Sequence, residues 1–278
     1  MTDSSGGSGP YGGVLGQLVF DLHSHSSFSD GDNDVEEMVR AAEAAQLKVY
    51  AVTDHLFGGD MLWKSAAPVQ SLLEAVIEAR SERDVEVLVG VEGVVMGPDG
   101  EITVSASIAD RLDLVLVDLG FGTHGVFFDA PVARWKLIRN SVDATIRACE
   151  HRHVNIFAHP FNLGRCEPAV DLRDIPGSAL DEVAAAFAET GTAFEIMNQM
   201  HYWFPNMRID DLTAAYTDIV IRFKEAGVRF SVGSDAHRVG SVGNLLWCAT
   251  VIRCAGLTTN QMIDPRLDLP LNTLRTAA

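Results

Sequence analysis

Short, continuous apolar runs recur along most of the chain. Seven of them, each four to seven residues long, lack the alternation of a strand with one face in water and therefore predict buried parallel strands. The runs are Leu18–Leu22, Val49–Val52, Val85–Val91, Leu114–Leu119, Val154–Ala158, Ala193–Met197 and Arg229–Val232.

Amphipathic helical patterns lie between most of these runs. Asp34 is a suitable N-cap for a helix that begins at Val35, and further helices are predicted at residues 71–80, 132–149, 179–189 and 211–226. Between Gly93 and Ile108, a Gly97-Pro-Asp-Gly100 turn flanked by β-prone residues favours a hairpin. This alternation predicts a barrel or an open doubly wound sheet, and in both folds chemistry collects at the carboxyl ends of the strands.

The first residues of the sequence differ in composition from the rest of the chain. Residues 1–17 are rich in Gly and Ser and predict a flexible tail, which leaves residues 18–278 as a single domain. The tail lacks the basic and apolar regions of a signal peptide, and no later run reaches the roughly 20 apolar residues that span a bilayer. We therefore expect a cytoplasmic protein without a membrane partner.

Charge and cysteine content exclude further classes. The formal net charge is −17, which argues against binding a long nucleic acid, because that affinity comes largely from Lys and Arg. A small-molecule substrate is expected instead. The 4 cysteines form no C-x-x-C pair, so reduced thiols are expected rather than disulfides or a thiolate metal site.

Metal-ligating residue types gather where the predicted strands end. Six of the 9 histidines lie there, together with Asp54, Glu92 and Asp235. The histidines are His23, His25, His55, His124, His159 and His237. Imidazole and carboxylate donors suit Zn, Mn or Fe, and the i, i+2 spacing of His23 and His25 puts both rings on one face of an extended chain. Their convergence on one edge of the sheet predicts a metal site.

The same segments resemble, in order, the successive motifs of the PHP (polymerase and histidinol phosphatase) family. The matching stretches are Phe20-Asp-Leu-His-Ser-His25, Ser29-Asp-Gly31, Val52-Thr-Asp-His55, Gly90-Val-Glu92, Thr123-His124, Phe157-Ala-His-Pro160 and Gly233-Ser-Asp-Ala-His237. The resemblance spans Leu18 to Gly243. It implies a distorted (β/α)7 TIM-like barrel with metal ions at the C-terminal ends of the strands, in agreement with the seven predicted strands.

The resemblance also implies how the ligands divide among two to three divalent ions. His23, His25, Glu92 and Asp235 would hold the first ion, Glu92, His124 and His159 the second, and Asp30, His55 and His237 the third. Glu92 would bridge two ions. Two ions roughly 3.5–4 Å apart produce a hydroxide that attacks phosphorus, so Glu92, Asp235 and His237 are the candidate catalytic residues.

Supporting residues are expected around this cluster. Asp54, Glu195 and Asn198 are candidates for orienting ligands or lining the pocket. Phosphate-binding candidates are Arg165, Arg238 and Arg134, of which Arg165 is favoured because it lies in the loop that follows His159. The aromatic segment 201–205 forms either a substrate wall or ordinary packing. His151 and His153 precede a strand, at the opposite rim, and receive no function.

The leading hypothesis is a phosphatase for a small phosphomonoester such as histidinol phosphate, a nucleotide or a sugar phosphate. Three alternatives remain: a phosphodiesterase or nuclease of the same family, an amidohydrolase-type C–N hydrolase, and a non-catalytic metal-binding PHP module. No lysine lies at a strand exit, which argues against the amidohydrolase, and the presence of every implied ligand position argues against the non-catalytic module. The substrate, the physiological metal and the oligomeric state stay open.

Overall fold

The protein is built around a barrel of short parallel strands. The computed structural model describes residues 18–81 and 83–275, so the predicted tail at residues 1–17 lies outside the described residues. The strands are β1 (Phe20–Asp21), β2 (Val49–Val52), β3 (His55–Leu56), β4 (Glu86–Val94), β5 (Leu114–Asp118), β6 (Ile156–Phe157), β7 (Ala193–Met197) and β8 (Phe230–Gly233).

Seven strands follow one another around the barrel in the order β1-β2-β4-β5-β6-β7-β8, and β3 pairs with β4. All of these pairs are parallel. The two ends of this path also meet, because Leu22 N donates to Val232 O at 3.2 Å and Ser24 bridges Ala236 in parallel. The seven apolar runs thus correspond to seven strands, and the distorted barrel predicted from the sequence is confirmed.

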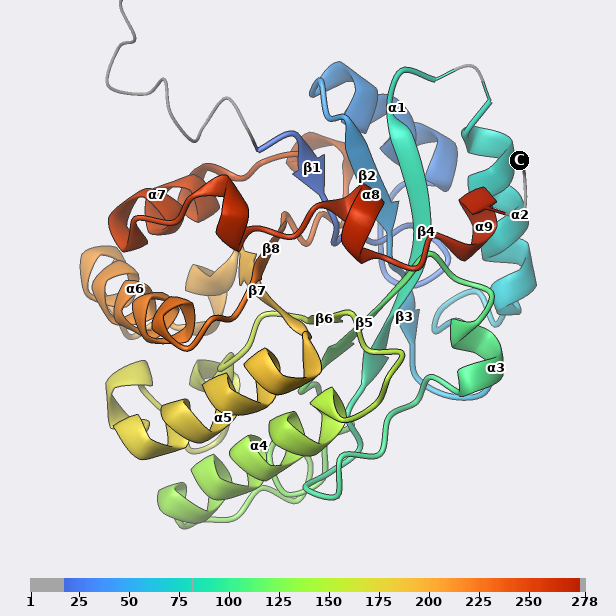
Figure 1. Ribbon diagram of the computed structural model, residues 1–278. Coiled ribbons are helices and arrows are strands. Elements are labelled where there is room, and N and C mark those ends of the chain that lie inside the picture. Colours follow the sequence, from blue (N-terminus) through green and yellow to red (C-terminus); the bar gives the residue numbers. More distant parts are fainter. Residues whose placement is uncertain (1–17, 82, 276–278) are drawn as a thin grey trace, which may run out of the picture.

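Helices cover the outside of the strands (Figure 1). They are α1 (Val35–Ala44), α2 (Val69–Ala79), α3 (Ala106–Ala109), α4 (Arg134–Cys149), α5 (Gly177–Thr190), α6 (Ile209–Glu225), α7 (Leu246–Ala255), α8 (Pro265–Asp268) and α9 (Asn272–Arg275). Asp34 caps α1 as predicted, in a capping box in which its carboxylate accepts from Glu37 N at 2.8 Å. Within the described part of the chain, no helix has both the length and the apolar character needed to cross a bilayer.

The connection between β4 and β5 contains the predicted hairpin. Val95 and Ile102 form an antiparallel bridge, and Gly100 N donates to Gly97 O at 2.9 Å across the turn. Only the four-residue α3 follows it before β5. A hairpin therefore replaces most of the helix that a regular β/α repeat would place here, which is one reason why the barrel is distorted.

Candidate metal centre

The carboxyl ends of the strands bring eight of the nine predicted ligands together. Strand register explains part of this convergence, since His55 in β3 lies directly opposite Glu92 in β4. His23 and His25 lie on the extended chain that follows β1, where alternate side chains point the same way. The loops after β6 and β8 supply His159, Asp235 and His237.

These side chains form three overlapping groups whose potential ligand atoms lie within 4.8 Å of one another. The groups are His23, His25 and Asp235; His23, Glu92 and His159; and His25, Asp30, His55 and His237. The third group contains the three residues predicted for the third ion and adds His25. The first two groups share His23, and the predicted partner His124 is in neither of them.

Glu92 occupies the middle of the cluster. One carboxylate oxygen, Oε1, lies 2.9 Å from Nε2 of His159, and the other, Oε2, lies 3.4 Å from Nε2 of His23 and 2.9 Å from Nδ1 of His55. The two oxygens therefore face different groups of histidines. This arrangement is compatible with the predicted bridging role.

Two buried polar atoms of the cluster face each other without hydrogen-bond geometry, and two imidazole nitrogens share a hydrogen bond with each other. Glu92 Oε2 and His55 Nδ1 are both buried and have no hydrogen-bond partner among the described residues, although 2.9 Å separates them. Nε2 of His23 and Nε2 of His25 are 3.1 Å apart. Buried polar atoms without partners are costly, and lone pairs that converge on one point suit a shared cation. The residues present thus fit divalent metal ions.

Glu195, at the end of the cluster away from the cavity, orients two of the histidines. Its carboxylate accepts from Nδ1 of His23 at 2.8 Å and from the backbone N of His159 at 2.8 Å. The first contact leaves Nε2 of His23 free to face the cluster. Gly233 makes this approach possible, because a Cβ at that position would overlap both Glu195 and His23. The predicted orienting role of Glu195 thus has a geometric basis.

Asp54 acts on the loop that carries Asp30. It accepts hydrogen bonds from the backbone N and the hydroxyl of both Ser26 and Ser29, at 2.6 to 3.0 Å. Ser29 in turn lies 3.5 Å from Nδ1 of His25. Asp54 therefore fixes the loop that carries Asp30, and Ser29, which belongs to one of the motifs shared with the PHP family, connects Asp54 to His25.

Two backbone positions in the cluster are strained. His159 has a φ of 34° and Asp235 a φ of 53°, in the left-handed region that costs a residue with a side chain about 1–3 kcal/mol. Each is held by a backbone hydrogen bond from its own N, to Glu195 Oε2 and to His23 O respectively. Strain of this kind is retained where it directs side chains into a functional site.

Electrostatics in the metal-free cluster favour charged side chains. Burial alone would lower the pKa of His23, but Glu195, Glu92 and Asp235 outweigh it and raise the pKa well above its usual range. Burial likewise opposes ionisation of Glu92, yet His23 and His55 hold its pKa well below the usual value. Protons on His23 and His55 thus balance the carboxylates of the cluster, whereas burial lowers the pKa of His25.

Zinc affinity is expected to rise with pH up to about pH 9. Burial would lower the pKa of His237, but Asp30 and Asp235 outweigh it and raise it to about 9, so the ring must lose a proton before it can bind a metal. Below that pKa, zinc must displace one proton from the ring, so each such proton makes the zinc affinity rise about tenfold for each unit by which the pH increases. Calorimetric zinc titrations in buffers of different ionisation enthalpy measure the released protons, and no proton release at neutral pH would contradict this expectation.

His124 does not reach the cluster. Its side chain is 56% exposed, with Nδ1 3.5 Å from Asp129 and the ring edge-on to Phe128. The reason is local, because its backbone N donates to Met96 O at 2.8 Å and ties this segment to the hairpin. The expectation that His124 would lie beside Glu92 and His159 therefore does not agree with the structure.

Two of the three predicted arginines also lie elsewhere. Arg134 begins α4 and pairs with Asp174 at 2.9 Å, and Arg238 is exposed outside the cavity that contains the cluster. Asn198 does not line that cavity either, and its Oδ1 instead accepts from Trp247 N at 2.9 Å, at the start of α7. These residues follow strands in sequence, but their side chains lie outside the cavity, although other residues of the loops after β7 and β8 line it.

A cavity of about 520 Å³ opens over the cluster. Its floor includes Asp30, His55, Glu92, His159, Asp235 and His237, and its walls include Asp118, Phe57, Trp63, Phe121 and Trp203.

Among the described residues, Arg165 is the one positively charged arginine or lysine side chain that lines this cavity. The guanidinium of Arg165 lies 4.7 Å from the ring centres of Phe127 and Trp203 and 5.1 Å from that of Phe121. Three aromatic rings therefore hold Arg165 in place.

Of the aromatic segment 201–205, Trp203 is the residue that forms a cavity wall. Its ring lies edge-on to His159 with centroids 4.4 Å apart, whereas Tyr202 is exposed. Phe57, Trp63, Phe121 and Asp118 were not singled out from the sequence. Asp118 is the next-to-last residue of the predicted strand Leu114–Leu119 and the last residue of β5, so a search of both strand ends and the positions beside them would have found it.

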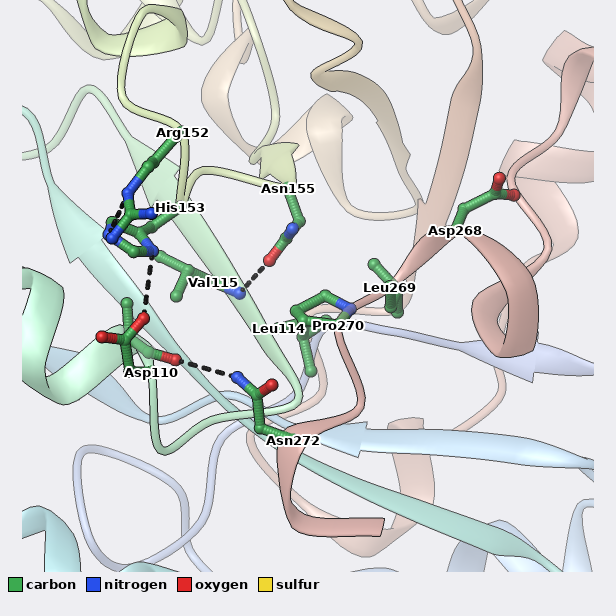
Figure 2. A pocket seen from close by; sticks show the side chains of 11 residues that line it. Asp110, Leu114, Val115, Arg152, His153, Asn155, Asp268, Leu269, Pro270 and Asn272 are labelled. Carbon is green, nitrogen blue, oxygen red and sulfur yellow. Dashed lines mark hydrogen bonds and ion pairs between the residues drawn. The ribbon is translucent and has the colours of Figure 1, made fainter. Parts of the chain in front are cut away.

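A second hollow lies at the amino-terminal ends of β5 and β6 (Figure 2). Here Asp110, Arg152 and His153 lie side by side, with His153 Nδ1 3.8 Å from Asp110 and Arg152 donating to His153 Nε2 at 3.1 Å. None of these residues belongs to the metal-ligand groups found among the described residues. His153 thus lies at the rim opposite the cluster, as the sequence predicts.

The barrel and its cluster of histidines and carboxylates define a metal-dependent hydrolase. The chain belongs to the PHP domain family, whose family model matches residues 21–199. It is 30% identical over 252 residues to a protein of Thermoanaerobacter sp. named a probable phosphatase, covering 89% of this chain and 91% of that protein. It is 27% identical to the probable phosphatase YcdX of Shigella dysenteriae over 88% of this chain and 89% of the relative.

A solved structure shares the fold. The histidinol phosphate phosphatase of Lactococcus lactis, in complex with zinc, L-histidinol and phosphate, superimposes with a TM-score of 0.64 over 86% of this chain and 94% of that one. The two sequences are 18% identical. This similarity confirms the barrel architecture independently of the sequence motifs.

Proposed function

We propose that residues 18–278 form one catalytic domain that hydrolyses a small phosphomonoester. The observation that carries this proposal is a single cavity that combines the histidine and carboxylate cluster with Arg165. Metal ligands and a fixed guanidinium are the two elements that recognition and hydrolysis of a terminal phosphate require.

The chemistry divides between the metal ions and the chain. Two or three divalent ions, zinc, manganese or iron, would activate a water molecule and polarise the phosphoryl oxygens when bound. Arg165 would hold the phosphate, because it lines the cavity and its guanidinium is fixed there by the hydrogen bond from Nη2 to Leu119 O at 3.1 Å. Glu92, Asp235 and His237 would hold the reacting groups in place at the cavity floor.

The cavity walls favour a substrate whose leaving group contains a planar ring. Phe57, Trp63, Phe121 and Trp203 all line the space above the cluster. Flat side chains of this kind stack on planar groups and exclude water from the site. The relatives named probable phosphatases and the Lactococcus enzyme complexed with L-histidinol and phosphate are consistent with such a substrate. Histidinol phosphate and nucleotides are therefore preferred over sugar phosphates.

Phosphomonoesters are expected to be hydrolysed with a kcat/KM at least about tenfold higher than matched diesters. A diester has one negative charge fewer on its phosphate, and one lost charge-assisted hydrogen bond costs about 1.5–3 kcal/mol. Steady-state rates with an aryl phosphate, the corresponding bis-aryl phosphate, a mononucleotide and a single-stranded oligonucleotide would test this, with the protein reloaded with zinc, manganese or iron.

The same panel separates the alternatives. Faster hydrolysis of the diester or oligonucleotide would favour a phosphodiesterase or nuclease and refute the monoesterase. A protein that binds metal and hydrolyses none of these esters would favour the non-catalytic module or the amidohydrolase-type C–N hydrolase.

A further inference from the structure

Strand β5 ends in a buried carboxylate that the metal-ligand assignment leaves unused. Asp118 is only 4% exposed and lines the same cavity as Glu92 and His159. Its Oδ1 is buried and has no hydrogen-bond partner among the described residues, while Oδ2 lies 3.6 Å from Nη2 of Arg165. A buried carboxylate oxygen without a partner is costly and points to a missing cation or donor.

Register places Asp118 beside the cluster. In the β4–β5 pair, Glu92 lies opposite Leu116 and Val94 lies opposite Asp118. Because side chains alternate along a strand, Leu116 and Asp118 point to the same side of the sheet as Glu92 and Val94. The carboxylate of Asp118 therefore projects into the barrel mouth one inward-facing position beyond Glu92.

The neighbouring ligand group lacks a donor from β5. That group consists of His23, Glu92 and His159, which come from the ends of β1, β4 and β6. Strand β5 runs between β4 and β6, and the histidine that follows it, His124, faces solvent. Asp118 is the residue of β5 that lines the cavity together with Glu92 and His159, and its oxygens lie outside the 4.8 Å ligand groups found among the described residues.

The turn after β5 is shaped to leave room for this carboxylate. A Cβ at position 120 would lie 2.8 Å from Oδ2 of Asp118, so any side chain there would push the carboxylate aside. Gly120 N donates to the Thr123 hydroxyl at 3.0 Å, which closes the turn. The same turn carries His124 away from the cavity.

We propose that Asp118 is the metal ligand that β5 contributes, completing the site formed by Glu92 and His159, and that His124 binds no metal. The carboxylate adds a hard oxygen donor to a site otherwise made of Glu92 and imidazoles. This inference rests on the proposed metal-dependent function.

The test is zinc binding by metal-free protein, measured by competition with a chromophoric chelator. Asp118→Asn, which keeps the shape and removes the charge, is expected to weaken one zinc site by at least about 10–100-fold, the loss typical of residues that only orient a ligand. Gly120→Ala should weaken the same site, because its Cβ displaces the carboxylate. His124→Ala is the matched control and should bind zinc like the wild type.

Each outcome is decisive once thermal unfolding shows that the metal-free variant is folded. Wild-type zinc affinity in Asp118→Asn would overturn the proposal and mean that Asp118 only balances the charge of Arg165. If Asp118→Asn does not fold, wild-type zinc affinity in Gly120→Ala would overturn it in the same way. Loss of a zinc site in His124→Ala would also overturn it. If the wild type binds none of zinc, manganese and iron, the metal centre itself is refuted, whereas metal binding without phosphatase activity refutes only the proposed function.

Discussion

Replacing Glu92 by glutamine is expected to abolish most phosphatase activity and to lower the metal content. Glu92 is fully buried, and its two oxygens face different histidines of the cluster. Glutamine keeps the volume but loses the negative charge and turns one acceptor into a donor. Because one side chain would serve two ions, the rate should fall by more than the roughly 10–100-fold typical of a residue that only orients a ligand.

Metal analysis by mass spectrometry and steady-state kinetics on the same preparation would measure both effects. His23→Ala and His159→Ala should lose metal in the same way, since both belong to the group that contains Glu92. His151→Ala and His201→Ala are controls, because neither residue belongs to a ligand group found among the described residues. Wild-type metal loading and turnover in Glu92→Gln would refute the bridging role.

Replacing Arg165 by methionine is expected to reduce kcat/KM for a phosphomonoester by about 100-fold while the metal content stays unchanged. Each charge-assisted hydrogen bond to the phosphate contributes about 1.5–3 kcal/mol, and methionine removes both donors of a bidentate contact. Methionine retains a long apolar chain that can pack among Phe121, Phe127 and Trp203.

The chain offers two matched controls for this variant. Arg134→Met and Arg238→Met remove the same charge outside the cavity and should leave kcat/KM unchanged. Arg165→Lys should recover only part of the loss, because an ammonium cannot make the planar bidentate contact. A full rate in Arg165→Met would mean that the guanidinium only packs against the aromatic rings and balances Asp118.

The pattern of the sequence predicted the strands, and the resemblance to the PHP family favoured a barrel over an open sheet. Each of the seven continuous apolar runs became a strand, because a parallel strand buried on both faces admits few polar residues. It did not predict α7, which buries Cys248, Val251 and Ile252. The segment Leu246–Ala255 is apolar on most sides, so periodicity does not separate a short buried helix from a strand.

The position of most cluster residues next to strand ends could also be read from the sequence. In a parallel barrel every strand ends at the same rim, so a ligand within a few residues of a strand end is carried to the site whatever the details of packing. His23, His25, His55, Glu92, His159, Asp235 and His237 all meet this condition, and each lies in a ligand group.

Only the tertiary structure decided which residues beyond the strand ends face the cavity. His124 lies six residues past the end of β5 at Asp118, and Arg165 lies eight residues past the end of β6 at Phe157, so their distances along the chain are similar. The loop after β5 is tied to the hairpin through Met96 and turns His124 outward, whereas three aromatic rings hold Arg165 over the cavity. Sequence spacing determines how far a loop reaches, but hydrogen bonds and packing against other segments determine its direction.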